Sequence, residues 1–500
     1  GDIVRVSDSK KELLTSPRRP IMVLPSYKGN YLAENVAPGL HTVGLMLPYS
    51  ALHHILFQDL DYPLVMTSAN LPGRPMLVEN EQILEGLEDI VDGFLLHNRS
   101  VVSRCDDSVV RQSGGTEKFI RRSRGWVPTP QKLEAGPESL LALGAEQDNV
   151  IGIYDEGKAY LSQYLGDIDN PDSLSFLRNA LDRLLSLTGI SMPSKVAHDT
   201  HPLFLTTELA EKIGEESHAI QHHRAHFGSL LGESGLDRAV GLVMDGAGYG
   251  DDGSIWGCEL FLRKDGQISR RGSLTPAYMP GGDLATKHPA RMVAGILYPL
   301  FEDRNEDDLL RFLHTLGLEF PGGEEELVAT VRQLYADLNV TQTTSAGRFL
   351  DAVSSLVGAC NERTYEGEPA MKLESFASRG SPRQIELPLI KTQGLLRLDQ
   401  NSILKRLVEL RERLEPADLA ATGEWAIAEG MSKLAIDVAR KHGISHVGLS
   451  GGVAYNDRIS ALIRQRTREA GLEYFTNEAV PPGDGGVAFG QLWVVGRMSS

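Results

Sequence analysis

Short apolar runs alternate with stretches of helical periodicity in the first quarter of the chain. Two runs, Ile21 to Leu24 and Leu64 to Thr67, predict strands, whereas His53 to Asp59 and Glu81 to Leu87 have the spacing of amphipathic helices. Strands that alternate with helices are typical of an α/β domain. The pattern therefore predicts such a domain up to about Trp126.

The same alternation returns in the rest of the chain. Two strands, Asn149 to Tyr154 and Lys158 to Tyr164, are expected to form a hairpin, followed by a long helix at Pro171 to Thr188. A glycine-rich loop then follows an apolar strand in two places, which are the segments Ala239 to Gly250 and Val447 to Ala470. Further predicted elements are a strand at Ser254 to Leu262, a largely helical region at Pro289 to Cys360 and a helix at Asp457 to Ala470.

A proline-punctuated, polar segment from Pro128 to Pro137 has the composition of a linker. A chain of 500 residues is too long for one hydrophobic core, because single cores stop growing near about 250 to 300 residues. The expected division is a first domain at 1–130, a linker at 131–138 and a second domain at 139–500.

Composition narrows the class of protein. With 41% hydrophobic and 23% charged residues, the chain is typical of soluble globular proteins, and no apolar run reaches the roughly 20 residues that cross a bilayer. The 67 acidic and 50 basic side chains give a net charge of -17, so the overall field repels polyanions. We therefore expect neither a membrane nor a nucleic acid as partner.

Three cysteines, Cys105, Cys258 and Cys360, are odd in number and far apart. This spacing argues against a disulfide framework or a Cys-x-x-Cys zinc site, so buried thiols in a reducing compartment are expected. No secretory signal is visible, although Gly1 in place of Met suggests a fragment. The expected location is the cytoplasm.

The segment Gln221 to His226 contains the strongest candidate for a metal site. His222 and His226 are one helical turn apart, so both imidazoles can reach one ion. Such pairs also cap helices or face solvent. The best candidates for oxygen ligands are Asp245 and Asp484, which stand in glycine-rich segments, although either could form only an Asx turn.

Two glycine-rich loops are candidates for phosphate binding. Asp245 and Gly246 follow an apolar strand directly, an arrangement that presents backbone N–H groups to a phosphate but also occurs in ordinary hairpins. Ser450 to Gly452 likewise stand between a strand and a helix N-terminus. Asn456 could bond a nucleotide or cap that helix.

The first domain offers a second group of candidate polar residues. Ser68 and Asn70 follow a predicted strand, where ligands usually bind, although a polar turn is the simpler interpretation. Arg122 and Arg124 have guanidinium groups that suit phosphates, unless they form only a solvated charged face. The adjacent carboxylates Asp106-Asp107 could assist Mg²⁺ or pair with those arginines.

In their order along the chain, these motifs resemble the HypF family of carbamoyltransferases, which mature NiFe-hydrogenases. Motifs similar to its YrdC-like domain are Leu14 to Ile21, Thr67 to Asn70, Arg104 to Ser108 and Arg122 to Gly125. Motifs similar to its actin-like domain are Leu143 to Glu146, Ser162 to Asp167, His198-Asp199, His222 to His226, Asp245-Gly246, Ser450 to Val453 and Gly483 to Gly486. The resemblance implies an α/β fold, with a partial YrdC-like domain followed by a two-lobed actin-like (ASKHA) carbamoyltransferase domain.

The family's acylphosphatase domain, its Cys-x-x-Cys zinc fingers and the lysine-containing start of its YrdC-like domain have no counterpart in this sequence. The resemblance therefore leads us to expect a chain truncated at its N-terminus. Its YrdC-like domain would then lack part of the site that makes the adenylate.

The resemblance also implies an activity. Family members use carbamoyl phosphate and ATP with Mg²⁺, through a carbamoyl adenylate, to transfer a carboxamido group to the C-terminal cysteine of the partner HypE. HypE then dehydrates the thiocarbamate, which leads to the cyanide ligands of the hydrogenase iron. Carried over to this chain, the metal ligands for iron or zinc would be His222, His226 and Asp484, with Asp245 as a fourth ligand or a phosphate-side group.

The resemblance assigns roles to further residues. Catalytic groups beside Asp245 would be Lys287 and Arg291. The groups that border nucleotide or carbamoyl phosphate in the second domain would be Gly246, Ser450, Gly451, Gly452 and Asn456, and the groups that face the adenylate in the first domain would be Ser68, Asn70, Arg122 and Arg124.

Three other functions are alternatives. An O-carbamoyltransferase of small-molecule hydroxyls would differ mainly in its acceptor pocket. A tRNA threonylcarbamoyltransferase is disfavoured by the acidic net charge. A non-catalytic, nucleotide-binding actin-like protein has no use for two histidines directed at a metal.

Overall fold

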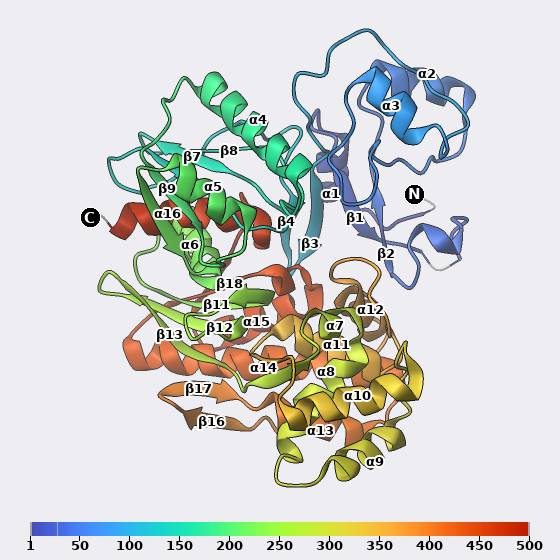
Figure 1. Cartoon of the computed structure of the whole chain (residues 1–500), viewed down its shortest axis with the longest axis vertical. Helices are drawn as coiled ribbons and strands as arrows, with labels where there is room; N and C mark the ends of the chain where they lie inside the picture. Colours follow the sequence, from blue (N-terminus) through green and yellow to red (C-terminus); the bar gives the residue numbers. More distant parts are fainter. Residues whose placement is uncertain (1–2, 28, 499–500) are drawn as a thin grey trace.

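The computed structural model describes residues 3–27 and 29–498, in which helices and strands alternate around three β-sheets (Figure 1). Gly1, which suggested a fragment, lies outside the described residues. Among the described helices, none is both long and apolar enough to cross a membrane.

The first sheet has four strands in the order β2-β1-β3-β4 and organises the N-terminal part of the chain. Its strands are β1 (Ile21–Pro25), β2 (Thr42–Leu45), β3 (Val109–Ser113) and β4 (Thr116–Arg121). The surrounding helices are α1 (Asp8–Thr15), η1 (Glu34–Val36), α2 (Ala51–Asp59) and α3 (Asn80–Leu87). Its core is small, since the buried cluster consists of Val4, Leu14, Met22 and Leu24.

The strand predicted at Leu64 to Thr67 is absent, and that prediction was wrong. Within this run, Val65 is 79% exposed and Met66 is 56% exposed. A strand needs a neighbour that satisfies its backbone hydrogen-bonding groups. None of the described strands of the sheet β2-β1-β3-β4 pairs with this run, so its backbone groups have no ladder to join.

The second and third sheets share one topology. In each, three consecutive antiparallel strands are followed by two strands that add in parallel beside the first of the three. In the second sheet these are β6 (Leu140–Ala142), β7 (Gly152–Asp155), β8 (Lys158–Leu161), β9 (Lys195–Asp199) and β10 (Glu216–Ile220). In the third they are β11 (Ala239–Tyr249), β12 (Ile255–Lys264), β13 (Gln267–Leu274), β18 (His446–Ser450) and β19 (Glu473–Thr476). The chain thus builds two lobes of the same plan, as a two-lobed α/β fold requires.

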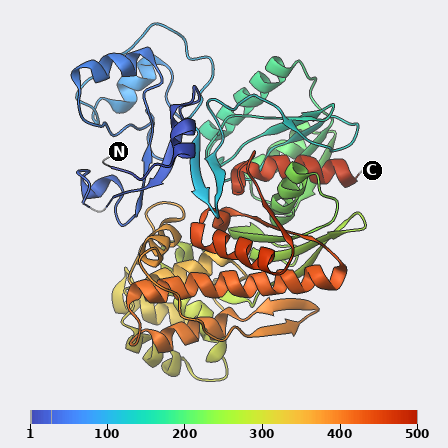
Figure 2. The ribbon, with the colours of Figure 1, turned by 180° about the vertical axis from the view of Figure 1, so that it is seen from behind.

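Helices cover both lobes, and two of them cross between the lobes. The helices of the second-sheet lobe are α4 (Pro171–Thr188), α5 (Leu205–Ile213) and, from the far end of the chain, η4 (Asp484–Gly486) and α16 (Val487–Met498). In contrast, α6 (His222–Ser234) packs against α16 and against β11, β12 and β18 of the third sheet. The helices of the third-sheet lobe are α7 (Asp283–Lys287), α8 (Pro289–Leu297), η2 (Tyr298–Leu300), α9 (Glu306–Leu316), α10 (Gly323–Ala336), α11 (Ala346–Leu356), α12 (Glu368–Ala377), α13 (Gln400–Leu410), α14 (Pro416–His442), η3 (Gly452–Tyr455) and α15 (Asp457–Glu469). The return of α16 to the earlier lobe is visible from both sides (Figures 1 and 2).

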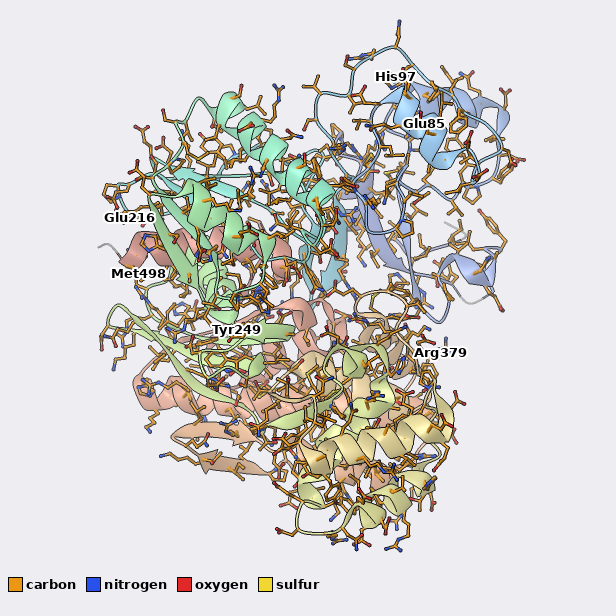
Figure 3. All side chains as sticks on the ribbon, in the orientation of Figure 1. Glu85, His97, Glu216, Tyr249, Arg379 and Met498 are labelled. Carbon is orange, nitrogen blue, oxygen red and sulfur yellow. The ribbon has the colours of Figure 1, made fainter. Side chains whose placement is uncertain are left out.

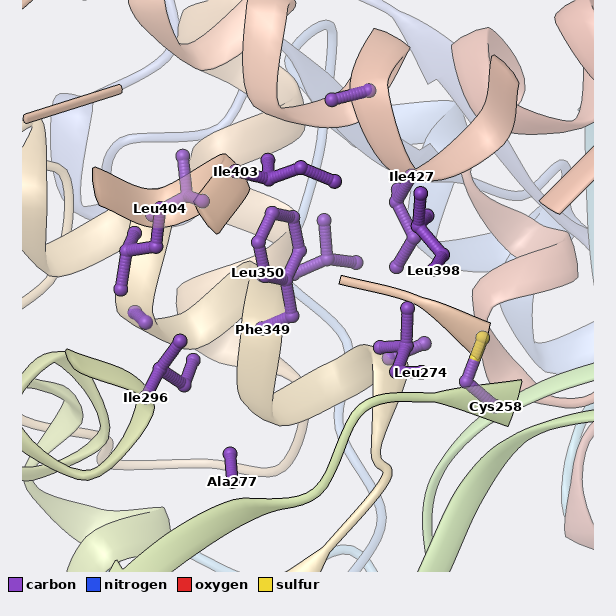
Figure 4. Close-up of a cluster of buried hydrophobic side chains, with 14 of the residues drawn as sticks. Cys258, Leu274, Ala277, Ile296, Phe349, Leu350, Leu398, Ile403, Leu404 and Ile427 are labelled. Carbon is purple, nitrogen blue, oxygen red and sulfur yellow. The ribbon is translucent and has the colours of Figure 1, made fainter. Parts of the chain in front are cut away.

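The largest core lies in the third-sheet lobe, where every described residue of α8 and α11 is buried. Phe349 and Leu350 of α11 lie among Ile403, Leu398 and Cys258 in this core (Figure 4). The helical character predicted for Pro289 to Cys360 is confirmed, with one interruption at β15 (Val340–Thr343), which pairs with β14 (Ala277–Pro280). A two-stranded ribbon, β16 (Leu389–Thr392) and β17 (Leu395–Leu398), extends the sheet beyond β13.

The segment predicted as a linker is packed rather than free. Its first residues form β5 (Gln131–Lys132), which pairs with β8, and Leu133 and Ala135 are buried. Their apolar side chains belong to the core that lies beside the second sheet. The low hydropathy of the neighbouring residues therefore did not indicate a free linker. The domain limits at 130 and 139 stay a prediction.

The cysteine prediction is correct for Cys258 and Cys360, which are buried free thiols. It is wrong for Cys105, which is exposed. Cys105 lies in the irregular segment before β3, where its Sγ is 3.5 Å from Ser123 Oγ.

The β3–β4 hairpin joins the first sheet to the third-sheet lobe (Figures 1 and 2). Lys118, on β4, is completely buried, and its Nζ donates a hydrogen bond to the Ala454 carbonyl at 2.9 Å. On β3, the Arg111 guanidinium pairs with Glu374 at 2.9 Å, again with both side chains largely buried. The interface is therefore fixed by desolvated polar contacts, which tolerate little displacement.

Burial lowers the pKa of Lys118 from 10.5 to about 7, with Arg111 adding to the effect. Between these two pH values the unfolded chain binds the proton that the folded chain has lost, so stability gains from this residue as pH rises. We expect the unfolding temperature of the wild type, relative to that of Lys118→Met, to increase from pH 7 to pH 10. Thermal unfolding of both proteins across this pH range tests the expectation. A difference in unfolding temperature that stays constant with pH would contradict it.

Candidate metal and phosphate site

Four side chains converge at the junction of the two lobes. One ligand atom from each of His222, His226, Asp245 and Asp484 lies within 4.8 Å of the others. The two imidazole Nε2 atoms are 3.1 Å apart. Asp245 Oδ2 lies 3.3 Å and 3.4 Å from these nitrogens, and Asp484 Oδ1 lies 3.5 Å and 3.4 Å from them.

The two histidines are placed by the start of α6. Gln221 caps this helix, because its side chain accepts a hydrogen bond from the Arg224 backbone N–H. The helical spacing of four residues then puts His222 and His226 on one face. The predicted geometry of this pair is confirmed, and both side chains are buried.

Asp245 is placed by an irregularity in β11. The sequence predicts that the strand ends at Asp245, but β11 continues to Tyr249, which lies where the two lobes meet (Figure 3). Met244 pairs with Cys258 and Gly248 pairs with Trp256, so three residues of β11 face the single residue Gly257. Such a bulge turns a side chain out of the ladder, and here it directs Asp245 toward the histidines.

Asp484 is placed by the contact between α6 and α16. It begins η4, which leads directly into α16. Gly490 of α16 lies against α6 so closely that a Cβ there would come within 1.8 Å of the Ala225 carbonyl oxygen. Gly228 of α6 has the reciprocal contact, since its Cβ would lie 2.8 Å from the Gly490 carbonyl oxygen. The close approach of the two helices thus sets Asp484 against His226.

Asp199, at the end of β9, orients the first histidine. Its Oδ2 lies 2.8 Å from His222 Nδ1, which leaves Nε2 to face the cluster. Burial alone lowers the pKa of His222, but Asp484, Asp199 and Asp245 together hold it well above its ordinary range. Burial likewise opposes ionisation of Asp245, whereas His222 and His226 hold the pKa of this carboxyl well below its usual range.

The donor set fits a divalent transition metal. Three buried or nearly buried carboxylates face two imidazoles, an excess of negative charge that a cation would balance. Two histidines with two carboxylates suit iron or zinc. The nitrogen of His226 that faces His222, Asp245 and Asp484 is Nε2, so this is the atom that would bind the ion.

We expect Asp199→Asn to weaken metal binding by about 10- to 100-fold, since partners that orient a ligating imidazole typically contribute that much. The amide cannot accept the His222 Nδ1–H as strongly as the carboxylate does. Metal titration of the purified variant, with Asp251→Asn as a control for an exposed aspartate, measures the effect. Equal affinities for Asp199→Asn and wild type would count against the proposed role of Asp199.

The glycine loops surround this cluster. The Gly452 backbone N–H donates to Asp245 Oδ1 at 2.9 Å, and the Gly451 N–H donates to the Pro482 carbonyl at 2.9 Å. The Ser450 hydroxyl donates to Asn477 Oδ1 at 2.8 Å. A Cβ added to Gly246 would meet no atom within 4 Å, so open space borders this residue. The structure thus gathers the two predicted phosphate loops around the four donors.

Asn456 has contacts of its own away from the four donors. Its Oδ1 accepts from the Ile459 N–H and caps α15, as one of the two sequence interpretations has it, while its Nδ2 donates to Glu424 at 2.7 Å. The contact of Asn456 with a nucleotide stays a prediction.

Lys287 and Arg291 make their contacts within the third-sheet lobe. Lys287 lies 3.6 Å from Glu362, and both are about half exposed. The buried Arg291 pairs with Glu326 at 2.6 Å and donates to the Pro280 carbonyl. Neither basic group joins the four donors, and their catalytic roles stay predictions.

The predicted residues of the first domain are dispersed. The hydroxyl of Ser68 donates to Asn70 in an exposed loop. Arg124 forms an ion pair with Asp107 at 2.6 Å, and its Cζ lies 3.7 Å from the centroid of the Tyr49 ring. The other acidic neighbour, Asp106, pairs with an arginine of β4. These carboxylates therefore form ion pairs with arginines, as one of the two sequence interpretations has it.

Arg122 differs from these neighbours. It is buried, and its Nη2 donates to the carbonyls of Trp126 and Thr129. Its Nε and Nη1 are buried without a hydrogen-bond partner among the described residues. Burial lowers its pKa to about 10, which still leaves the group charged at neutral pH. The contact of Arg122 with the adenylate stays a prediction.

Sequence reasoning missed two residues around the cluster. Asp199 was noted only as part of a motif, although an acidic residue at a strand end is a signal for such a role. Tyr455 was passed over, because nothing in its sequence neighbourhood shows that its hydroxyl reaches the Gly483 N–H beside Asp484.

Comparison with known proteins gives the family context of this geometry. Residues 241–491 match a family model described as the second subdomain of a carbamoyltransferase Kae1-like domain, and residues 135–233 match one described as the HypF Kae1-like domain. Residues 2–123 match the Sua5/YciO/YrdC family model, described as telomere recombination. The chain thus joins a YrdC-like domain to an actin-like domain of Kae1 type.

Individual relatives agree with these matches. The probable carbamoyltransferase HypF of Methanocaldococcus jannaschii is 41% identical over 97% of this chain, and the carbamoyltransferase HypF2 of Cupriavidus necator is 35% identical over 99% of it. The chain spans 63% and 65% of the lengths of these two relatives.

Solved structures show the same fold. The crystal structure of T. kodakarensis HypF matches with a TM-score of 0.93 and 38% identity, covering all of this chain and 66% of that one. A full-length HypF crystallised in a phosphate- and nucleotide-bound form matches with a TM-score of 0.91 and 32% identity, covering 99% of this chain and 77% of that one. From the matches to its domains, its relatives and its fold, the chain belongs to the HypF carbamoyltransferase family.

Proposed function

We propose that this chain transfers the carboxamido group of carbamoyl phosphate, with ATP and Mg²⁺, through a carbamoyl adenylate to the C-terminal cysteine of the maturation partner HypE. The thiocarbamate would serve the synthesis of the cyanide ligands of NiFe-hydrogenase. Membership of the HypF family supports the transferase class. The observation that carries the proposal is the convergence of His222, His226, Asp245 and Asp484 beside two glycine loops.

The proposed reaction has three steps, each of which balances. Water cleaves the C–O bond of carbamoyl phosphate and releases phosphate and carbamate. A carbamate oxygen attacks the α-phosphorus of ATP and expels pyrophosphate, which gives the carbamoyl adenylate. The cysteine thiolate then attacks the carbonyl carbon, forms the C–S bond and expels AMP.

The first step fits the junction of the lobes. A divalent ion held by His222, His226, Asp245 and Asp484 would polarise an anionic oxygen of the substrate. Open space beside Gly246 lets a phosphate approach the backbone. The Gly452 N–H fixes Asp245 through a hydrogen bond, so the carboxylate is oriented before substrate arrives.

The adenylate step fits the first domain. The buried Arg122 has two nitrogens, Nε and Nη1, without a hydrogen-bond partner among the residues that the structure describes, which suits an anion such as the α-phosphate. Carbamate and adenylate are both labile in water, so two sites within one protein limit their loss.

The test uses purified protein, ¹⁴C-labelled carbamoyl phosphate, ATP, Mg²⁺ and HypE. The proposal predicts label on the C-terminal cysteine of HypE, together with one pyrophosphate and one AMP per label. A HypE variant in which that cysteine is serine is the control. Phosphate release without label on HypE would show that the chain carries out only the first step. Absence of both phosphate release and label would overturn the proposal.

A further inference from the structure

Tyr455 connects the first domain to the candidate metal site. It is the last residue of η3, which follows the Ser450 to Gly452 loop. Its hydroxyl donates to the Phe119 carbonyl of β4 at 3.0 Å and accepts from the Gly483 N–H at 3.3 Å. Gly483 directly precedes the candidate ligand Asp484, so one side chain links the hairpin to that ligand's own backbone.

The hydroxyl is suited to this double contact. Burial and the nearby Asp148 raise the pKa of Tyr455 well above its ordinary value, so the hydroxyl keeps the proton that it donates. Space around Gly483 is also limited, since a Cβ there would lie 3.0 Å from the Tyr455 oxygen. The backbone ahead of Asp484 therefore rests directly on this side chain.

The rest of η3 is held by the same hairpin. Its Ala454 carbonyl accepts from Lys118 Nζ at 2.9 Å and from Ser113 Oγ at 2.7 Å. At the other end of η3, the Gly452 N–H donates to Asp245 Oδ1. This four-residue turn therefore contacts one candidate carboxylate at its start and supports the other at its end, while β3 and β4 fix its middle.

Such support matters because metal sites demand accurate placement. Ligand distances that depart by more than about 0.2 Å from their ideal values weaken a site, and ligands on loops are held less accurately than ligands on helices. The two histidines lie on α6, but Asp484 belongs to a short 3₁₀ turn that follows a loop. Its position depends on contacts from outside that loop.

We propose that Tyr455 is a positioning residue, through which the β3–β4 hairpin of the first domain holds Asp484 in the geometry that the metal site requires. The first domain would thus complete the site of the second, in addition to its own chemistry. This inference rests on the proposed metal site.

Tyr455→Phe tests the proposal, because it removes both hydrogen bonds and keeps the ring. The matched control is Tyr335→Phe, which also removes a hydroxyl bonded to backbone carbonyls, those of Phe301 and Asn305, within the third-sheet lobe. Three readouts are compared on the full chain: Co²⁺ affinity, the visible absorption spectrum of the Co²⁺-bound protein, and amide hydrogen exchange of segment 481–486.

For Tyr455→Phe we expect Co²⁺ affinity to fall by about 10- to 100-fold, a change in the Co²⁺ spectrum, and faster exchange of segment 481–486. Tyr335→Phe should match wild type in all three. A merely structural role would lower the unfolding temperature and leave the spectrum and the local exchange unchanged, which would overturn the proposal.

The experiment also separates this inference from the proposed function. If wild type binds Co²⁺ and Tyr455→Phe binds it equally well with the same spectrum, the positioning role fails while the metal site stands. If wild type takes up no Co²⁺, the metal site itself fails, and with it the positioning of a metal ligand.

Discussion

Replacing His222 and His226 together by alanine is expected to lower metal affinity by far more than 100-fold and to abolish phosphate release from carbamoyl phosphate. Loss of a partner that only orients a ligand costs about 10- to 100-fold in affinity, and this variant removes two ligands outright. Asp245 and Asp484 would remain, and two carboxylates alone offer a transition metal only half of the original donor set.

Elemental analysis and a phosphate-release assay on the same preparations measure both effects. A double variant of His314 and His442 to alanine is the control, because these histidines lie on α9 and α14, outside the cluster. Asp484→Asn keeps the histidines and tests the site with a smaller change. Full metal content and full activity in the His222/His226 variant would rule out these histidines as ligands.

Replacing Gly490 by alanine is expected to destabilise the protein by about 3 kcal/mol and to impair the metal site, because overpacking a close contact typically costs that much. The new Cβ would lie 1.8 Å from the Ala225 carbonyl oxygen and 2.7 Å from the Ser229 nitrogen, both in the backbone of α6. Backbone atoms of a helix cannot rotate away as a side chain can. The helices must therefore separate, and α6 carries His226 while η4, which contains Asp484, leads directly into α16.

Thermal unfolding and Co²⁺ titration test this pair of effects. We expect the unfolding temperature to fall by about 3 °C, because an unfolding entropy of about 2.1 cal/mol/K per residue applies to a chain of 500 residues. Gly93→Ala is the matched control, since a Cβ there would meet no atom within 4 Å. Unchanged melting in Gly490→Ala would show that α6 and α16 can separate at no cost, contrary to the expectation.

The part of the site that depends on local geometry could be predicted from the sequence. The spacing of His222 and His226 within one helix fixes their relation, and the structure brings their Nε2 atoms to 3.1 Å. Asp245 and Asp484 were candidates because of their glycine-rich surroundings. Asp245 lies close to the histidines because of a bulge in β11, and Asp484 because α6 and α16 pack closely. Both features depend on contacts between segments that are distant in the sequence.

The failures of sequence interpretation have the same origin. The apolar run Leu64 to Thr67 has the composition of a strand, but strand formation also needs a free neighbouring edge. The loop predicted after Asp245 is strand, because β12 continues to pair beyond the bulge. The role of Tyr455 depends on a hairpin more than 300 residues earlier in the chain, at Phe119, so no local pattern could reveal it.

The return of α16 to the second-sheet lobe has a consequence for the order of folding. Buried residues of α16, among them Phe489 and Trp493, belong to the same core as the early strands. The face of the second sheet that packs on α16 cannot be covered until the chain has passed through the whole third-sheet lobe, and contacts so distant in sequence form slowly. In the incompletely folded chain, the two histidines would lie on an exposed helix, and Asp484 would not yet be close to them. A chain that has not finished folding should therefore hold metal only weakly, so tight metal capture would report that both lobes are complete.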